Sequence, residues 1–76
     1  MDVRKRIGIN LKRLRQGSGL SQEELAFESG LHRTYISGVE RGVRNPTVLV
    51  LEKIVVALKV PAAALLDEVP RRKKLR

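Results

Sequence analysis

The residues best suited to chemistry lie in the segment GLHRTYISGVERG, residues 30–42. On a helix, the polar face of this segment consists of Arg33, Thr34, Ser37 and Gly38, which are small or hydrogen-bonding residues. A helix that only has to stay in water usually carries Glu and Lys on its outer face instead. The pattern therefore favours binding chemistry, in which this face is pressed against another polar surface.

The inventory of side chains does not support catalysis. The chain has one histidine and no cysteine, and no two carboxylates are placed to share acid–base work. No cluster has the spacing of metal ligands, and no glycine-rich phosphate loop is present. We therefore expect no enzyme activity, no cofactor and no metal. The lack of cysteine excludes a disulfide framework and fits the reducing cytoplasm, where we expect the protein to reside.

Length and charge indicate one small basic domain followed by a tail. The chain has 76 residues and a net charge of +8, from 16 Lys and Arg against 8 Asp and Glu. Five of these positive charges lie in the last six residues, RRKKLR. We expect a domain over residues 1–69 and a flexible basic tail over residues 70–76, which either keeps the chain in solution or contacts nucleic acid. No signal peptide is visible, and no apolar run approaches the roughly 20 residues of a membrane span.

The spacing of apolar residues predicts an all-α domain of five short helices. Ile7, Leu11 and Leu14 recur at helical spacing and predict an amphipathic first helix. Ser21, followed three residues later by Glu24, forms a capping box that opens the second helix. The later boundaries rest on Gly42 as a left-handed helix end, Thr47 as a cap and Pro61 in a first turn. The expected helices are residues 3–16, 21–28, 33–42, 47–59 and 61–67.

The second and third helices are predicted to form a helix-turn-helix unit. Only about three residues, Ser29 to Leu31, join them, so they must cross at a steep angle. Ala26 is small enough for the close approach of the two backbones, and Gly30 can take the positive φ that the turn needs. The apolar residues expected to fix the pair against the first helix are Leu25, Leu31, Ile36 and Val39. A generic corner of two helices is the alternative.

The segment LSQEELAFESGLHRTYISGVERGVRNPT resembles the helix-turn-helix of the Xre family, the lambdoid phage repressor and Cro-like transcriptional regulators. Its part RTYISGVER is most similar to the controller proteins of restriction–modification systems. The resemblance covers residues 7–66. It implies a compact five-helix domain that binds double-stranded operator DNA as a homodimer, with the third helix in the major groove. Such a regulator represses or activates, controls its own gene in some cases, and as an activator has RNA polymerase as a further partner.

The resemblance also implies which residues contact DNA. Gln22 would contact a phosphate and brace the third helix. Arg33 would contribute most to specificity, because an arginine can form two hydrogen bonds with guanine. The residues implied at base edges and nearby phosphates are His32, Arg33, Thr34 and Ser37, with Tyr35 at the margin. Those implied at the DNA backbone beyond the groove are Arg41, Arg44 and Asn45.

Four features of this region allow two interpretations or depart from the family pattern. His32 stands where relatives more often have a helix-capping Ser, Thr or Asp, so it either faces DNA or only ends a turn. Tyr35 either lies half buried beside the first helix or offers its hydroxyl to a phosphate. Gly38 leaves a gap where many relatives carry a longer polar side chain. The family places a partly buried arginine, here Arg15, against Glu40; the alternative is an exposed surface pair.

The fourth helix predicts a subunit interface, because it is more apolar than one core-facing stripe requires. The expected inner stripe is Val48, Leu51, Ile54, Val55 and Leu58. The residues left for a dimer interface on the fourth and fifth helices are Leu49, Val50, Val56, Leu65 and Leu66. The alternative is that these residues complete a small core.

An antitoxin that binds both DNA and a toxin is the main functional alternative to a dimeric regulator. Such a role favours an extended segment that can wrap a partner protein. Only nine residues follow Asp67, which we expect to be too few. The sequence therefore favours a single-domain transcription factor, whose operator and regulated genes it does not identify.

Overall fold

The computed structural model describes residues 1–69, and this part of the chain contains four α-helices and one 3-10 helix, without a strand. The elements are α1 (Val3–Gly17), α2 (Gln22–Ser29), α3 (Arg33–Glu40), α4 (Val48–Leu58) and η1 (Ala62–Leu66). The expected basic tail, residues 70–76, lies outside the described residues. The all-α prediction is confirmed for residues 1–69.

The expected fifth α-helix is a 3-10 helix instead. Pro61 precedes it as the capping residue with an extended backbone, rather than taking its first helical position. Ala64 donates its N–H to the Pro61 carbonyl at 2.9 Å, a bond that spans three residues. A segment of five residues closes few of the longer α-helical bonds, so the tighter helix is the usual outcome.

The helix starts predicted from caps at Ser21 and Thr47 are confirmed. Ser21 and Glu24 form the capping box, with the Glu24 N–H 3.0 Å from the Ser21 hydroxyl and the Ser21 N–H 2.8 Å from the Glu24 carboxylate. The Thr47 hydroxyl accepts a hydrogen bond from the Val50 N–H at 3.2 Å. Asp2 caps α1 in the same way, and hydrogen bonds from the Arg4 side chain and backbone lower the pKa of its carboxyl to about 2.

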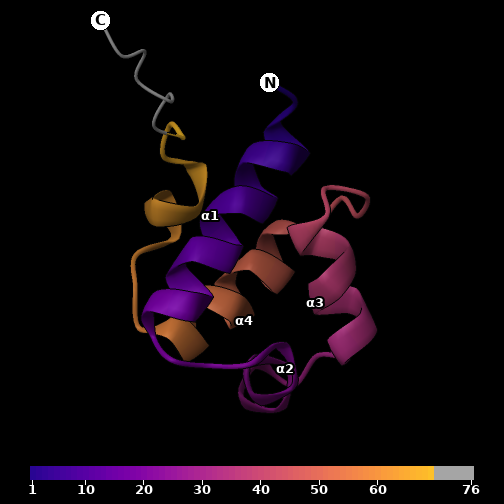
Figure 1. The fold of residues 1–76 in the computed structure, drawn as a ribbon, viewed down its shortest axis with the longest axis vertical. Coiled ribbons are helices and arrows are strands. Elements are labelled where there is room, and N and C mark those ends of the chain that lie inside the picture. Colours follow the sequence, from indigo (N-terminus) through magenta and orange to yellow (C-terminus); the bar gives the residue numbers. More distant parts are fainter. Residues whose placement is uncertain (70–76) are drawn as a thin grey trace, which may run out of the picture.

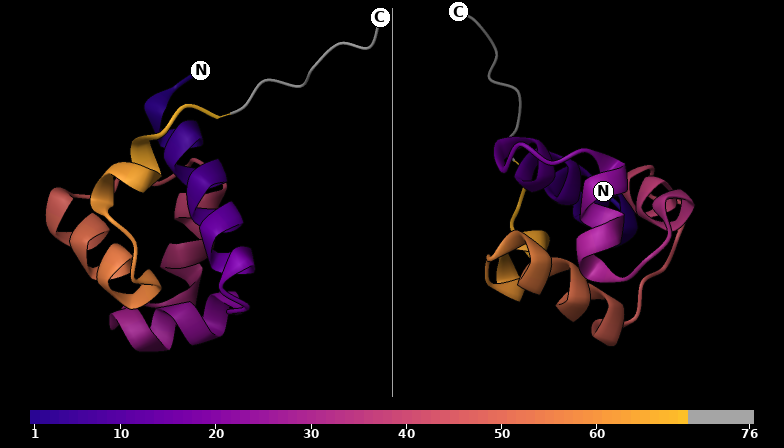
Figure 2. Two further views of the ribbon diagram at one scale, coloured as in Figure 1. Left: turned by 90° about the vertical axis from the view of Figure 1, so that its left-hand side faces the viewer. Right: turned by 90° about the horizontal axis from the view of Figure 1, so that it is seen from below.

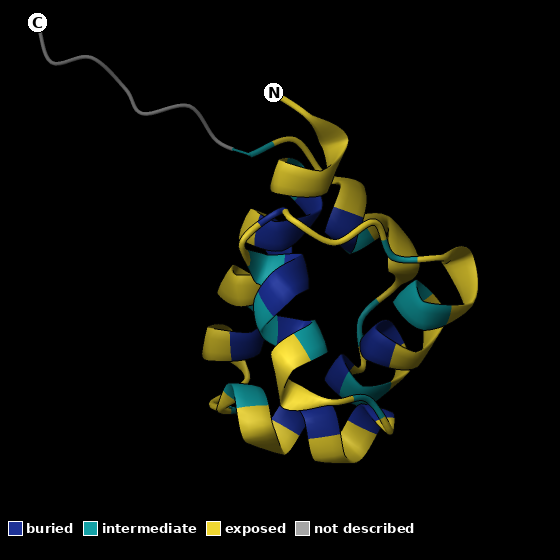
Figure 3. Cartoon of the chain, turned by 90° about the vertical axis from the view of Figure 1, so that its right-hand side faces the viewer, coloured by how far each residue is buried: buried dark blue, intermediate teal, exposed yellow. Residues whose placement is uncertain are grey.

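The helices surround one core, and α2 lies below the ends of α1 and α3 in the view of Figure 1. Figure 2 shows η1 next to α4. Helix α4 also packs on α2, and η1 packs on α1. Gly30 has a φ of 74°, which allows the tight turn between α2 and α3. Buried segments of the helices face the centre and exposed ones face outward (Figure 3). The core consists of Ile7, Leu11, Leu25, Ala26, Ile36, Val39, Ile54, Val55, Leu58 and Leu65, with Leu31 partly buried against it.

The inner stripe predicted for α4 is wrong at its first residue. Val48 is 81% exposed, whereas Val50, which was expected on the outside, is partly buried against the core. Ile54 and Leu58 are both buried, and a helix repeats the same face every three to four residues. Position 50, four residues before Ile54, therefore continues the buried face, and position 48 does not.

Leu65 belongs to the core of the chain, so its assignment to a dimer interface is wrong. Its side chain is fully buried. The buried side chain of Asn10 holds this segment, because its amide nitrogen donates to the carbonyls of Leu65 and Asp67, each at 2.8 Å. The Asn10 oxygen accepts from the Arg13 guanidinium at 2.8 Å, so the buried amide is bonded at both ends. This contact attaches η1 to α1 and carries Leu65 inward.

Candidate nucleic-acid interface

One face of α3 is buried and the other is open to the outside. Ile36 and Val39 are buried in the core. Arg33 and Thr34 are exposed, and Ser37 is half-buried. The polar face predicted for this helix therefore exists, except at Gly38.

A buried ion pair fixes the C-terminal end of α3 against α1. The Arg15 guanidinium contacts both carboxylate oxygens of Glu40, with Nε 2.6 Å from Oε2 and the second nitrogen 3.1 Å from Oε1. The two side chains are only 10% and 4% exposed. The hydrogen bond to Glu40 raises the pKa of the Arg15 guanidinium above its ordinary value, so the guanidinium stays charged. Of the two interpretations of this pair, the structure supports the partly buried one.

The same ion pair also binds the start of α2, through Glu40, and the preceding loop, through Arg15. The Gln22 side-chain amide donates to Glu40 Oε1 at 3.0 Å. Arg15 donates in addition to the Leu20 carbonyl at 2.8 Å. Gln22 thus braces α3, as the resemblance implies. Since the charges are paired and hydrogen-bonded from three segments, the network fixes the orientation of α3.

Gly8 allows α1 and the end of α3 to come this close. A Cβ atom at this position would lie 2.5 Å from the carbonyl oxygens of both Val39 and Glu40. Sequence reasoning missed this residue, although a glycine in the interior of a predicted helix is a signal for close packing. Asn10 was missed as well, because a polar residue within a basic helix resembles a surface residue.

Arg44, in the loop after α3, lies back over that helix. Its guanidinium carbon is 5.4 Å from the centre of the Tyr35 ring. Gly38 is buried beneath the Arg44 side chain, so its predicted place on the exposed polar face is wrong. Tyr35 is partly buried against the core, which agrees with the first interpretation of this residue.

Three arginines are exposed on and around α3. Arg33, Arg41 and Arg44 are all exposed, and so are His32 and Asn45. His32 stands at the cap position of α3 but makes no capping hydrogen bond with its side chain. The single acid within residues 30–46 is Glu40, which Arg15 neutralises. In contrast, α2 exposes three acids, Glu23, Glu24 and Glu28.

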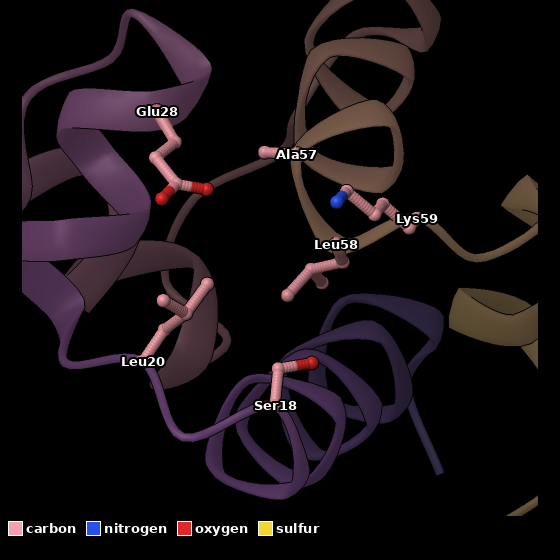
Figure 4. A pocket seen from close by; sticks show the side chains of 6 residues that line it. All are labelled: Ser18, Leu20, Glu28, Ala57, Leu58 and Lys59. Atoms are coloured by element: carbon pink, nitrogen blue, oxygen red, sulfur yellow. The ribbon is translucent and has the colours of Figure 1, made fainter.

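The candidate site is thus the exposed surface of α3 and of the loop that follows it. A hollow of about 260 Å³ lies elsewhere, where the turn after α1 meets α2 and the end of α4 (Figure 4). Its lining residues are Ser18, Leu20, Glu28, Ala57, Leu58 and Lys59, none of which is a predicted DNA contact. Within residues 1–69, no three acidic or histidine side chains are grouped to hold a metal ion. No helix in that range is both long and apolar enough to cross a membrane.

Known proteins resemble this chain in sequence and in fold. Residues 11–65 match the helix-turn-helix family HTH_3. The control protein C.BamHI of Bacillus amyloliquefaciens is 48% identical over 67 residues, covering 87% of this chain and 83% of that protein.

Two solved structures of restriction–modification controller proteins have the same fold. The structure of C.AhdI from Aeromonas hydrophila has a TM-score of 0.80 at 45% identity, covering 82% of this chain and 94% of that one. C.Esp1396I, solved as a tetramer in complex with its natural 35 base-pair operator, has a TM-score of 0.78 at 38% identity and 86% coverage of both chains. These matches confirm the resemblance seen in residues 20–47.

Replacing Glu40 with alanine tests whether the buried network holds α3. The substitution leaves the buried Arg15 charge without its partner, which should lower the free energy of unfolding by about 3–5 kcal/mol. Chemical denaturation followed by circular dichroism measures this loss. As a control, Arg15→Met combined with Glu40→Leu removes both charges and should be more stable than Glu40→Ala alone. A loss below about 1 kcal/mol for Glu40→Ala, typical of an exposed pair, would contradict the assignment.

Proposed function

This chain belongs to the helix-turn-helix family HTH_3, and we propose that it acts as a homodimer on an inverted-repeat operator. Within that family it is a transcriptional regulator close to restriction–modification controller proteins. One observation carries the proposal: the exposed, arginine-bearing face of α3 is held in a fixed orientation by the buried Arg15–Glu40 pair. A helix fixed in this way can enter the major groove without rearranging. We further propose that the operator controls a restriction–modification operon or the gene of the regulator itself.

We assign base reading to the exposed residues at the start of α3. Arg33 is exposed, and within residues 1–69 no carboxylate is bonded to it, so both edges of its guanidinium are available for a guanine. Thr34, Ser37 and the exposed imidazole of His32 are the other residues assigned to base edges or neighbouring phosphates. Residues assigned to the DNA backbone are Gln22, Tyr35, Arg41, Arg44 and Asn45.

We place the dimer interface on the outer faces of α4 and η1. Leu49 is 76% exposed, Val56 64% and Leu66 47%, and Val50 borders them from the core side. Val48, which the structure turns outward, joins this group in place of Leu65. A cluster of exposed aliphatic side chains on neighbouring elements is typical of a protein interface. The tetrameric operator complex of C.Esp1396I supports assembly of this fold on DNA.

We also propose RNA polymerase as a partner, through α2. Phe27 is 88% exposed on this helix, and its neighbours Glu23, Glu24 and Glu28 are exposed acids. Phosphates repel these carboxylates, so this surface remains available to a protein while α3 is on DNA. An exposed aromatic ring among charged residues is a suitable anchor for a protein contact.

Arg33→Ala tests the base-reading assignment. The operator, first selected from random DNA, should bind this variant roughly 5- to 150-fold more weakly, because a two-bonded arginine–guanine contact provides about 1–3 kcal/mol of discrimination. Random DNA should lose much less affinity. Fluorescence anisotropy over a series of salt concentrations measures both. Arg41→Ala serves as the control, since loss of a phosphate contact weakens all sequences alike and lowers the salt slope by about 1. Equal losses on both DNAs for Arg33→Ala would exclude base reading.

Leu49→Glu tests the interface. A carboxylate placed in the aliphatic cluster should produce folded monomers, which sedimentation velocity detects at tens of micromolar. Ile9→Glu makes the same chemical change at an exposed residue of α1 and should leave the dimer intact.

The wild-type dimer should select an inverted repeat with half-site centres roughly 34 Å, or about ten base pairs, apart. A monomeric wild-type chain, or a selected site without two-fold symmetry, would count against the dimer.

Phe27→Ala tests the polymerase contact. In transcription with purified RNA polymerase and a promoter that carries the operator, the variant should activate less while footprinting shows unchanged operator occupancy. The reason is that the lost ring belongs to a surface that does not face DNA. Val43→Ala, at an exposed apolar residue of the loop after α3, is the matched control. Equal activation by Phe27→Ala and the wild-type chain would remove α2 as the polymerase contact.

A further inference from the structure

Gly38 stands in the middle of the recognition helix α3, where a glycine needs a reason. Its backbone is helical and does not require a positive φ, and alanine is a better helix former than glycine. The surroundings supply the reason. A Cβ atom at this position would lie 2.6 Å from Cγ of Arg44, 3.3 Å from its Nε and 3.5 Å from its Cδ. The three nearest atoms thus belong to one side chain, so the volume that a residue-38 side chain would fill is occupied by Arg44.

The backbone of Gly38 holds the same loop from beneath. Its carbonyl accepts hydrogen bonds from the N–H groups of Val43 at 3.0 Å and Arg44 at 3.3 Å. Arg44 therefore begins next to Gly38, crosses it with its aliphatic stem, and ends with its guanidinium over the Tyr35 ring, 5.4 Å from the centre. Tyr35 is one helical turn before Gly38 and lies on the same side of α3. The Arg44 side chain is thus held in place by contacts at its backbone N–H, its aliphatic stem and its guanidinium.

We propose that Gly38 is a positioning residue for Arg44: its missing side chain lets the arginine lie along α3, so that the guanidinium meets DNA already ordered. A free arginine side chain has many rotamers, and ordering it on binding lowers affinity. A side chain that is already ordered avoids most of this loss. The inference rests on the proposed DNA-binding function and extends it, because it gives a residue without a side chain a role in affinity.

Gly38→Ala tests the inference, because the fold and DNA binding should change in opposite directions. The closest atom that the new methyl group meets is Arg44 Cγ at 2.6 Å, which can move away by rotation of the arginine about its Cα–Cβ bond without displacing the backbone. The melting temperature should therefore stay the same or rise with the better helix former. Affinity for the selected operator should fall roughly two- to tenfold, as Arg44 loses its fixed position. Gly17→Ala is the matched control, since no atom lies within 4 Å of its new methyl group, and it should leave affinity unchanged.

The decisive comparison adds Gly38→Ala to a chain that already carries Arg44→Ala. If Gly38 acts through Arg44, the second substitution has no further effect on affinity, and the two losses are not additive. An equal loss with and without Arg44, or unchanged affinity of Gly38→Ala in the wild-type chain, would overturn the inference. Failure of the wild-type chain to select any operator would instead contradict the proposed function, so the two failures are distinguishable.

Discussion

The carboxylate of Glu40 is the point on which the arrangement of this domain depends. It lies at the end of α3 and accepts hydrogen bonds from Arg15 on α1 and from Gln22 on α2. A buried charge is tolerated only when it is paired and hydrogen-bonded, so these helices can take few other relative positions without a large penalty. The orientation of α3 is therefore set by polar contacts of defined direction, whereas apolar packing alone tolerates rotation of a short helix.

Helix α1 provides the other fixed contacts, each on a different side. Gly8 faces the last carbonyls of α3 at a distance that excludes any side chain. Ile7 and Leu11 enter the core. Asn10 holds η1 through two backbone carbonyls. Because α1 packs on both α3 and η1, it links the helix proposed to enter the major groove to the segment next to the proposed dimer interface.

Sequence reasoning predicted the features whose causes are local. The capping box of Ser21 and Glu24 and the left-handed turn at Gly30 depend on residues a few positions apart, and both are present. The ion pair of Arg15 and Glu40 was inferred only through family resemblance, because 25 residues separate its members.

The features that sequence reasoning missed depend on tertiary packing. Helix α4 is apolar on nearly every side, so its hydrophobic pattern does not define which face turns inward. For that reason the prediction buries Val48 and exposes Val50, whereas the structure has the reverse. Asn10 binds backbone carbonyls 55 and 57 residues away, which no side-chain pattern reports. The burial of Leu65 follows from that contact. The sequence predicts a gap on the surface at Gly38, but in the structure the Arg44 side chain from the following loop covers this residue.

The attachment of η1 to α1 also sets the order in which the domain can form during synthesis. Leu65 fills the core, and the amide of Asn10 finds its acceptors only at residues 65 and 67. While a ribosome still covers these residues, α1 can form locally, but its core-facing side and the Asn10 amide stay open to water. Loop closure over 55 residues is thus among the last steps of folding. A nascent chain would consequently acquire its native stability only after nearly all of the domain has emerged.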